Sequence, residues 1–434
     1  MDESASGHLG PIRLAAGYTR LNAVTYLYAA FVTIGMFAFI SFIQPYLINA
    51  NLDVPEGEQG RLTGILGFSN ELVSLLLFAP VGAMADKIGR RPVYALGFIW
   101  LAAGYMLYPL ARSFPQLLAC ALFFAVGVSM VGCMLATVLA DIPHERSRGL
   151  LVGLTGFFQG LGAVAAVLVL GSIPKRLADA GMDAMTAGRI TLGVAAALCL
   201  LTAVVCALGL KRGTPSLAAP RESLVAVIRD GLHAARVNPR IWLAYLLSFA
   251  SRGDLVVIGT FFTLRLTQAG IENGMSVPDA SDAAKRPYII AQTAALLWSL
   301  VFGVLMDRLD RVTAGIVAMG LASVAYIAAG FVATPDNILI VPIAIALGVG
   351  QLSSILAGQT LLGQEAPRDV RGAVFGLASI CGSLGILFAT SLGAILYDTL
   401  SKGAPFVLFG AFNLLVMCFA LVVRFSQKGS TAAA

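Results

Sequence analysis

The sequence predicts an all-α membrane protein in which twelve transmembrane helices form two pseudo-symmetric bundles of six. Three observations lead to this prediction: the apolar composition, the number of long apolar segments, and two motifs that each occur twice. Of the 434 residues, 58% are hydrophobic and only 12% are charged, whereas soluble globular domains have about 25% charged residues. A chain this apolar would expose larger apolar patches than a soluble protein tolerates, so we expect lipid to surround it.

Twelve segments are long and apolar enough to cross a bilayer, which takes about 20 residues in a helix. Glycine and proline interrupt many of them, as is common in membrane helices. We predict spanning helices at residues 22–48, 61–84, 92–112, 114–140, 149–173, 189–210, 240–268, 286–306, 312–333, 338–363, 372–398 and 404–424.

The distribution of lysine and arginine predicts the orientation. With both termini placed in the cytoplasm, 19 of the 29 basic residues fall on the cytoplasmic side, 9 on the outer side and one, Arg252, inside the membrane. Cytoplasmic loops carry such an excess, so we expect a multi-pass protein of a plasma membrane of the bacterial inner type. The first twenty residues are polar, so the first helix would serve as an uncleaved signal.

The longest polar interruption, residues 211–239, divides the chain near its centre. We therefore expect a cytoplasmic tail at 1–21, a first bundle at 22–210, a linker, a second bundle at 240–424 and a tail at 425–434. Within the linker, Leu224, Ile228 and Leu232 recur every four residues and would share one face of a helix over 223–237. Such a helix fits either a linker on the membrane surface or a regulatory docking element.

Two motifs each occur once in either half of the chain. The run GAMADKIGRR at 82–91 follows the second predicted helix, and GVLMDRLDR at 303–311 follows the eighth. The run DIPHERSRG at 141–149 follows the fourth helix, and EAPRDVRG at 365–372 follows the tenth. The offset from Gly82 to Gly303 is nearly the same as the offset from Arg148 to Arg371. Two matches at nearly one offset indicate that the bundles are parallel repeats.

The run at 82–91 matches the pattern G-x-x-x-D-[RK]-x-G-R-[RK] at every fixed position, and the chain therefore resembles the major facilitator superfamily from residue 22 to 424. The resemblance implies that superfamily's fold and a transport function, but does not indicate the substrate. The second copy departs from the pattern because Asp310 replaces the glycine found at Gly89. The resemblance thus implies that the first copy is the more important gate.

Charge and geometry suggest how this gate would work. Asp86 would lie near the positive end of the helix that begins around Gly372, and Arg90 would pair with Asp141 or with another carboxylate at the cytoplasmic mouth. Contacts that form in one conformation and break in another would make the loop a latch; the alternative is a positive loop that only fixes topology. The predicted gate residues are Gly82, Asp86, Lys87, Gly89, Arg90, Arg91, Asp141, Arg148, Asp307, Arg308 and Arg371.

Three charged residues fall near the predicted mid-membrane: Glu71, Arg252 and Asp254. A charge at that depth costs at least about 2.5–3.5 kcal/mol, so such residues usually serve pairing, protonation or ligand contact. Positions i and i+2 lie about 200° apart on a helix, so Arg252 and Asp254 need different partners unless Gly253 loosens the helix, with Glu71 as a possible partner for Arg252. We expect these three residues to couple transport to protons; the alternative is a static ion-pair cluster.

Polar and amphipathic residues at similar depth are candidates for solute contact, although each could instead form a hydrogen bond between packed helices. Gln292 is the repeat equivalent of Glu71, at the offset that separates Gly82 from Gly303, so the second half carries an amide in place of a carboxylate. Helices five and ten often line the cavity in the superfamily, which favours Gln159 and Gln351. The predicted solute-binding residues are Gln44, Tyr46, Asn70, Gln159, Gln292, Trp298 and Gln351.

The sequence therefore favours a secondary transporter that moves a small organic solute by alternating access with proton coupling. The alternatives are a proton-driven exporter of drugs, metabolites or amphiphiles, and a sensor or scaffold that does not transport. Its six cysteines fall in apolar runs and its three histidines in polar stretches, which predicts no metal site. We expect no enzyme activity, no cofactor and no nucleic-acid partner, and a monomer whose partners are lipid, solute and protons.

Overall fold

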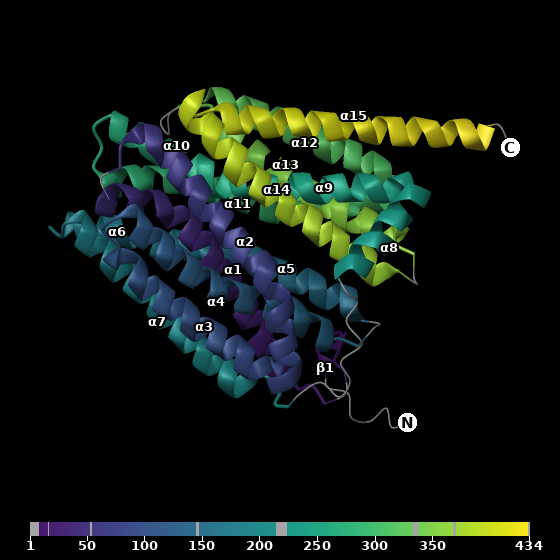
Figure 1. Ribbon diagram of the computed structural model, residues 1–434, viewed down its shortest axis with the longest axis horizontal. Coiled ribbons are helices and arrows are strands. Elements are labelled where there is room, and N and C mark those ends of the chain that lie inside the picture. Colours follow the sequence, from purple (N-terminus) through teal and green to yellow (C-terminus); the bar gives the residue numbers. More distant parts are fainter. Residues whose placement is uncertain are drawn as a thin grey trace. The chain divides into compact units, whose positions relative to one another are not determined.

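Helices dominate the computed structural model, which describes residues 8–15, 17–52, 54–144, 147–213, 224–332, 337–367 and 370–432. Twelve helical runs within these ranges are long and apolar enough to cross a membrane. The fold is therefore the predicted all-α membrane fold with twelve spanning helices (Figure 1).

The spanning helices include segments of π-helix and are accompanied by a few shorter elements. In chain order the elements are β1 (His8–Leu9), β2 (Ile12–Arg13), α1 (Arg20–Leu47), η2 (Ile48–Leu52), α2 (Glu56–Ile88), α3 (Arg90–Leu107), η3 (Tyr108–Leu110), α4 (Phe114–Asp141), α5 (Arg148–Leu170), α6 (Ile173–Asp179), α7 (Ala184–Gly209), α8 (Leu224–Val237), α9 (Pro239–Val256), η5 (Val257–Phe262), α10 (Thr263–Glu272), α11 (Val277–Arg308), α12 (Arg311–Phe331), α13 (Ile340–Glu365), α14 (Arg371–Thr399) and α15 (Ala404–Ala432).

Several helices extend past their predicted bounds into polar sequence, and α15 ends at Ala432 and not at residue 424. We predicted helices from residues 61 and 286, but α2 begins at Glu56 and α11 at Val277. The sequence prediction selected apolar residues, and the first turns of α2 and α11 are too polar to meet that criterion. They nevertheless form helix. The seventh span runs through α9, η5 and α10 without a break from Pro239 to Glu272.

The chain forms two compact units. Unit 1 contains residues 1–54, 69–219 and 277–282, and unit 2 contains residues 55–68, 220–276 and 283–434. In unit 1, α1 packs on α5 and α3 packs on α4 and α7. In unit 2, α9 packs on α13 and α14, and α12 packs on α13 and α15. As a result, α2 begins in unit 2 and ends in unit 1, whereas α11 does the opposite.

Equivalent helices of the two units cross at paired glycines. A Cβ atom on Gly35 of α1 would lie 2.8 Å from the carbonyl oxygen of Gly162 in α5. In unit 2, a Cβ atom on Gly253 of α9 would lie 3.2 Å from the carbonyl oxygen of Gly385 in α14. Small residues let membrane helices approach this closely.

The helix starts repeat at the offsets of the two sequence motifs. The starts of α2 and α11 are separated by the same offset as Gly82 and Gly303. The starts of α5 and α14 are separated by the same offset as Arg148 and Arg371. The paired crossings and the matching starts together confirm the internal repeat.

The linker helix α8 rests on unit 2. The hydroxyl of Tyr245 in α9 donates to the carbonyl of Gly231 at 3.1 Å, Ala235 is buried, and Ile228 and Leu232 pack against the same core. The predicted apolar face therefore meets protein, at least through these two residues. The Leu224 side chain and residues 214–223 lie outside the described part, and the position of α8 at a membrane surface stays a prediction.

The N-terminal tail is attached to the connection between α4 and α5. Strands β1 and β2 pair antiparallel, and the amide of Ala15 donates to the carbonyl of Ile142 at 2.8 Å. The amide of His144 donates to the carbonyl of Arg13 at 3.0 Å, and Leu14 is fully buried. The sequence indicated only a polar tail here, because backbone pairing of this length leaves no periodic signal.

Candidate functional site

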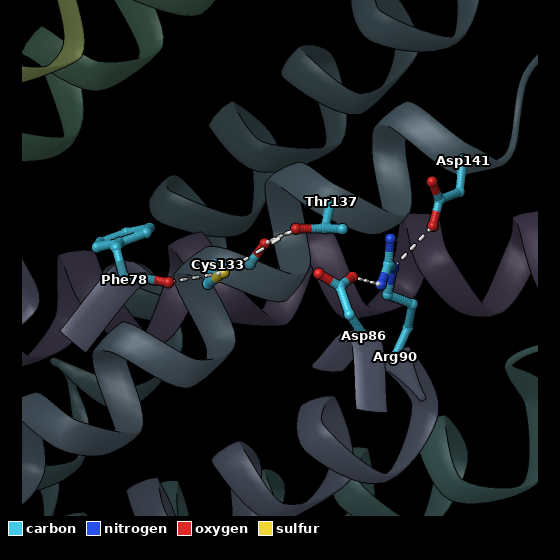
Figure 2. Close-up of polar contacts among 6 residues, drawn as sticks. All are labelled: Phe78, Asp86, Arg90, Cys133, Thr137 and Asp141. Carbon is cyan, nitrogen blue, oxygen red and sulfur yellow. Dashed lines mark hydrogen bonds and ion pairs between the residues drawn. The ribbon is translucent and has the colours of Figure 1, made fainter. Parts of the chain in front are cut away.

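Three charged residues from α2, α3 and α4 meet at one end of unit 1. Figure 2 shows Arg90 between Asp86 and Asp141. Its Nη1 lies 2.5 Å from Asp86 Oδ1, and its Nε lies 2.9 Å from Asp141 Oδ2. The structure thus contains the predicted pair between Arg90 and Asp141. The side chains are 17% to 29% exposed, so water reaches the network and partly screens it.

A left-handed turn brings Arg90 to this position. Gly89 has a φ of 98° and immediately precedes α3, and this conformation is open to glycine at no steric cost. In the second half, Asp310 has a φ of −58° and its carboxylate accepts from the amides of Val312 and Thr313, at 3.1 and 3.3 Å. The departure from the motif therefore replaces a glycine turn by an N-cap.

The remaining predicted gate residues lie outside this charge network or outside what the structure describes. Gly82 is buried within α2, and Lys87 and Arg308 are exposed. The guanidinium of Arg371 lies 5.6 Å from the centre of the Phe375 ring. Arg91 is partly exposed, and the side chains of Arg148 and Asp307 lie outside the described part. The contact of Asp86 with the start of α14 stays a prediction, because the two belong to different units.

A cavity of about 280 Å³ lies beside this network, between the tail and the end of α7. Its polar lining includes Tyr18, Arg90, Asp141 and Lys211. The Lys211 ammonium lies 4.2 Å from the centre of the Tyr18 ring. Burial, and secondly the charge of Asp141, raises the pKa of Tyr18 to about 12. The tail thus contributes to the surroundings of the charge network.

Asp254 and Arg252 lie on opposite sides of α9, as the helical geometry predicts. Asp254 is fully buried, and Asn413 Nδ2 of α15 lies 3.0 Å from its Oδ1 and 3.3 Å from its Oδ2. Arg252 is exposed and its side chain passes Gly382 of α14. The α-helix continues to Val256, so Gly253 serves the helix crossing and does not loosen α9.

Glu71 is the third predicted coupling residue. It lies partly exposed in α2 within unit 1, whereas Arg252 belongs to unit 2. Their pairing, and a role for all three residues in proton coupling, stay predictions.

Two of the predicted solute-binding residues make hydrogen bonds between packed helices. The fully buried Tyr46 donates its hydroxyl to the carbonyl of Ala184 at 2.6 Å, which ties α1 to α7. Trp298 Nε1 donates to Ser353 Oγ at 2.8 Å, which ties α11 to α13. For these two residues the geometry supports the packing interpretation.

Three of the predicted amides have a buried polar atom that makes no hydrogen bond within the described structure. These atoms are Gln44 Nε2, Asn70 Oδ1 and Gln351 Oε1. Gln159 and Gln292 are partly exposed. A buried polar atom without a partner is costly. Gln44, Asn70 and Gln351 are therefore better candidates for ligand contact than Tyr46 and Trp298.

A carboxylate clamp that the sequence did not indicate lies in unit 2. Asp398 of α14 accepts hydrogen bonds from the amides of Gly60 at 3.0 Å and Arg61 at 2.6 Å, near the start of α2. A Cβ atom on Gly64 would overlap Ala394 and Thr390 of α14. The stretch Gly60, Gly64 and Gly67 falls on one helix face, and this spacing was a signal that could have indicated close packing.

A series of side-chain hydrogen bonds continues this clamp. Gln268 Nε2 donates to Gln59 Oε1 at 2.9 Å, and the hydroxyl of Tyr397 donates to Gln268 Oε1 at 2.5 Å. In unit 1, Lys175 Nζ lies 2.7 Å from Asp279 Oδ1 near the start of α11. The first turns of both α2 and α11 are therefore held by polar contacts.

Arg265 is buried, although it is one of the nine basic residues that the predicted orientation places on the outer side. It is 6% exposed, and its Nη1 donates to the carbonyls of Ala329 and Gly330 at 2.9 and 3.2 Å. Both carbonyls lie in the last turn of α12, where a cation is favoured by the helix dipole. The residue therefore caps α12.

Comparison with known proteins agrees with this architecture. The chain is 27% identical over 416 residues to the magnetosome protein MamH of Paramagnetospirillum magneticum, covering 93% of this chain and 92% of that protein. It is 26% identical to the magnetosome protein MamZ of Magnetospirillum gryphiswaldense over 87% of this chain, but spans only 58% of that protein.

Solved structures share the fold. The nucleoside transporter NupG superposes with a TM-score of 0.68 at 14% identity, covering 93% of this chain and 99% of NupG. A bacterial homologue of the human lysosomal transporter Spinster, inward-facing and unoccupied, gives 0.66 at 16% identity, covering 94% and 98%. The sequence profile of the Major Facilitator Superfamily matches residues 25–341 and 272–433. This chain therefore belongs to the major facilitator superfamily of membrane transporters.

Proposed function

We propose that this chain is a secondary active transporter that moves a small organic solute by alternating access. The observation that carries the proposal is the pair of polar contacts at the two ends of α2. Asp398 holds the amides of Gly60 and Arg61 near its start, and Arg90 holds Asp86 at its end. Partly exposed contacts of this kind are individually weak, so they can break and re-form as α2 moves.

Proton coupling is the second part of the proposal. Asp254 is a carboxyl group with no exposed surface inside a spanning helix, where a charge costs at least about 2.5–3.5 kcal/mol. Gain and loss of a proton by Asp254, and by Glu71 in α2, would couple conformation to the proton gradient. Arg252 would respond electrostatically to these changes.

The amides of Gln44, Asn70 and Gln351 support a solute that forms hydrogen bonds. Each has a buried polar atom without a partner in the described residues, and a bound solute would satisfy it. Gln159 and Gln292 would add further donors and acceptors. The solute class is therefore a polar organic molecule and not a purely apolar one.

Transport into proteoliposomes with an imposed pH gradient tests this function. A panel of labelled polar solutes should include one whose accumulation depends on the gradient, and the gradient's direction separates uptake from export. Asp254→Asn and Glu71→Gln should each abolish that dependence, whereas Asp179→Asn, at an exposed loop-side carboxylate, should retain it. Gradient-dependent transport in both Asp254→Asn and Glu71→Gln would contradict proton coupling.

The membrane and the orientation are also proposals. We expect a monomer in a plasma membrane with both termini cytoplasmic, on the basis of the basic residues. Protease accessibility of terminal tags in intact cells tests this, and a tag cleaved from outside would contradict it.

The relatives favour a second candidate location. The match to the magnetosome protein MamH runs almost from end to end of both chains, which favours a magnetosome membrane for this chain as well. Fractionation of the source cells tests this candidate. Enrichment of the chain with magnetosomes would support it, and enrichment with the plasma membrane alone would contradict it.

A further inference from the structure

Asp254 and Asn413 form an isolated polar pair inside unit 2. Both side chains are fully buried, and Asn413 Nδ2 reaches both carboxyl oxygens, at 3.0 and 3.3 Å. Ser354 of α13 is the neighbouring hydroxyl, and it donates to the carbonyl of Gly350 at 2.9 Å. The carboxyl group is therefore surrounded by neutral groups.

The helices packed around Asp254 present neutral groups to it as well. Tyr326 of α12 is the titratable neighbour, and its hydroxyl donates to the backbone carbonyl of Asp254 at 2.8 Å. From α14, Gly385 packs against Gly253. Arg252 lies on the far side of α9 and is exposed. Among the described residues, the structure thus shows no positive charge that would pair with an ionised Asp254.

Asn413 itself is incompletely bonded in this arrangement. Its Nδ2 donates to the carboxyl group, but its Oδ1 is buried and has no hydrogen-bond partner among the described residues. An ionised carboxylate offers only acceptors and cannot satisfy this oxygen, whereas a protonated carboxyl group has one O–H donor. Protonation would therefore remove two penalties, the buried charge and the unsatisfied amide oxygen.

We propose that Asp254 is a proton-binding site that holds its proton in an acid–amide pair with Asn413. The acid O–H donates to Asn413 Oδ1, and Asn413 Nδ2 donates to the other carboxyl oxygen. Proton binding converts the carboxylate to the acid with no other bond change. Asn413 is the positioning residue, because it fixes the carboxyl group and accepts a hydrogen bond from its O–H.

The first half of the chain shows that helix packing does not require this pair. Met36 follows Gly35 at the equivalent crossing, as Asp254 follows Gly253, and Met36 is also fully buried. The hydroxyl of Tyr105 donates to the carbonyl of Met36 at 2.7 Å, as Tyr326 donates to that of Asp254. The same backbone contacts therefore form around an apolar side chain, and the acid in the second half is an addition to the scaffold.

The burial of the pair has a consequence for transport. Asp254 has no exposed surface in the conformation described, so release of its proton to water requires a movement of the helices packed around it. This consequence deepens the proposed proton coupling and rests on it, whereas the acid–amide pair itself does not.

Infrared spectroscopy of the full-length protein in lipid vesicles tests the pair directly. At neutral pH we expect the carbonyl stretch of a protonated carboxylic acid, which Asp254→Asn removes and the exposed control Asp179→Asn retains. Asn413→Leu should move this band to the frequency of a more weakly hydrogen-bonded acid. An ionised Asp254, seen as no change in the acid band between wild type and Asp254→Asn, would overturn the proposal.

The site could instead hold a sodium ion, bound by the Asp254 carboxylate and Asn413 Oδ1. Thermal unfolding in two salts separates this alternative from a bound proton, and it depends neither on the spectra nor on transport. We expect the wild type to be equally stable in sodium chloride and in choline chloride. If sodium chloride stabilises the wild type but not Asp254→Asn, the proton site is overturned. An acid band in a protein whose transport ignores the pH gradient would refute the coupling and leave the pair standing.

Discussion

Asp254 and Met36 occupy equivalent positions in the two repeats of this chain. Each follows a glycine at a helix crossing, and each offers its backbone carbonyl to a buried tyrosine hydroxyl, at 2.8 and 2.7 Å respectively. The repeats therefore share one packing solution, with an apolar side chain in the first and an acid in the second. Because burying an acid is costly, its presence in only one of two matching scaffolds indicates a function beyond folding.

The coupling between Asp254 and Asn413 can be measured by a double-mutant cycle. Asn413→Leu leaves a buried carboxyl group without its partner and should destabilise by about 1–3 kcal/mol. The double variant Asp254→Met with Asn413→Leu removes both polar groups and should be near wild type in stability. Thermal unfolding in detergent provides the measurement. The cycle also needs the single variant Asp254→Met. If the loss of stability in the double variant equals the sum of the losses in the two single variants, the two side chains are not coupled.

The charge network around Arg90 should depend on the shape of the guanidinium group. Arg90→Lys keeps the charge, but an ammonium cannot make the two directed contacts with Asp86 and Asp141. We expect a loss of about 1 kcal/mol in unfolding free energy, reduced at high salt because the group is partly exposed. Arg308→Lys, at an exposed site, is the matched control. Equal melting temperatures for both variants would argue against the network.

Gly64 should tolerate no side chain while α2 lies against α14. A Cβ atom there overlaps Ala394 and Thr390, so Gly64→Leu should destabilise unit 2 by about 1–3 kcal/mol through overpacking. The matched control is Gly57→Ala in the same helix, where a Cβ atom meets nothing within 4 Å; it should stabilise slightly, by about 0.5–1 kcal/mol. Chemical denaturation of both variants distinguishes these signs, and a neutral Gly64→Leu would mean that the contact does not form.

The N-terminal tail should contribute to stability. Leu14 is fully buried against the connection between α4 and α5, so Leu14→Ala should cost about 2–3 kcal/mol if the tail stays bound, or release the tail. Pro11→Ala, at an exposed position, should change stability by less than about 0.5 kcal/mol. Hydrogen exchange at the amides of Ala15 and His144 reports release. Unchanged protection in Leu14→Ala together with unchanged stability would contradict the described attachment.

The sequence was sufficient for the features that depend on periodicity and spacing. Apolar length located the twelve spans, the repeated motifs identified two related halves, and helical geometry separated Arg252 from Asp254. The pair of Arg90 with Asp141 followed from charge and loop position. These features are local, or they repeat at a fixed offset, and so they can be recognised in one chain.

Features that depend on which helices meet could not be predicted in the same way. Asp398 reads as one more carboxylate at a helix end, and its role as an acceptor for Gly60 and Arg61 requires the contact between α2 and α14. Asn413 is one more polar residue in an apolar segment, and nothing in that segment indicates Asp254 as its neighbour. The bond from Tyr46 to the carbonyl of Ala184 likewise depends on where α1 meets α7, which the segment around Tyr46 does not indicate.

The most direct test of proton coupling is the movement of protons, in either direction, when solute is added to proteoliposomes, followed with a pH-sensitive dye inside the vesicles. For the wild type, solute addition should move protons through the protein, and Asp254→Asn should bind solute and move no protons. Proton movement of wild-type size in Asp254→Asn would contradict proton coupling through this residue, because the buried carboxyl group would then not carry the coupled proton.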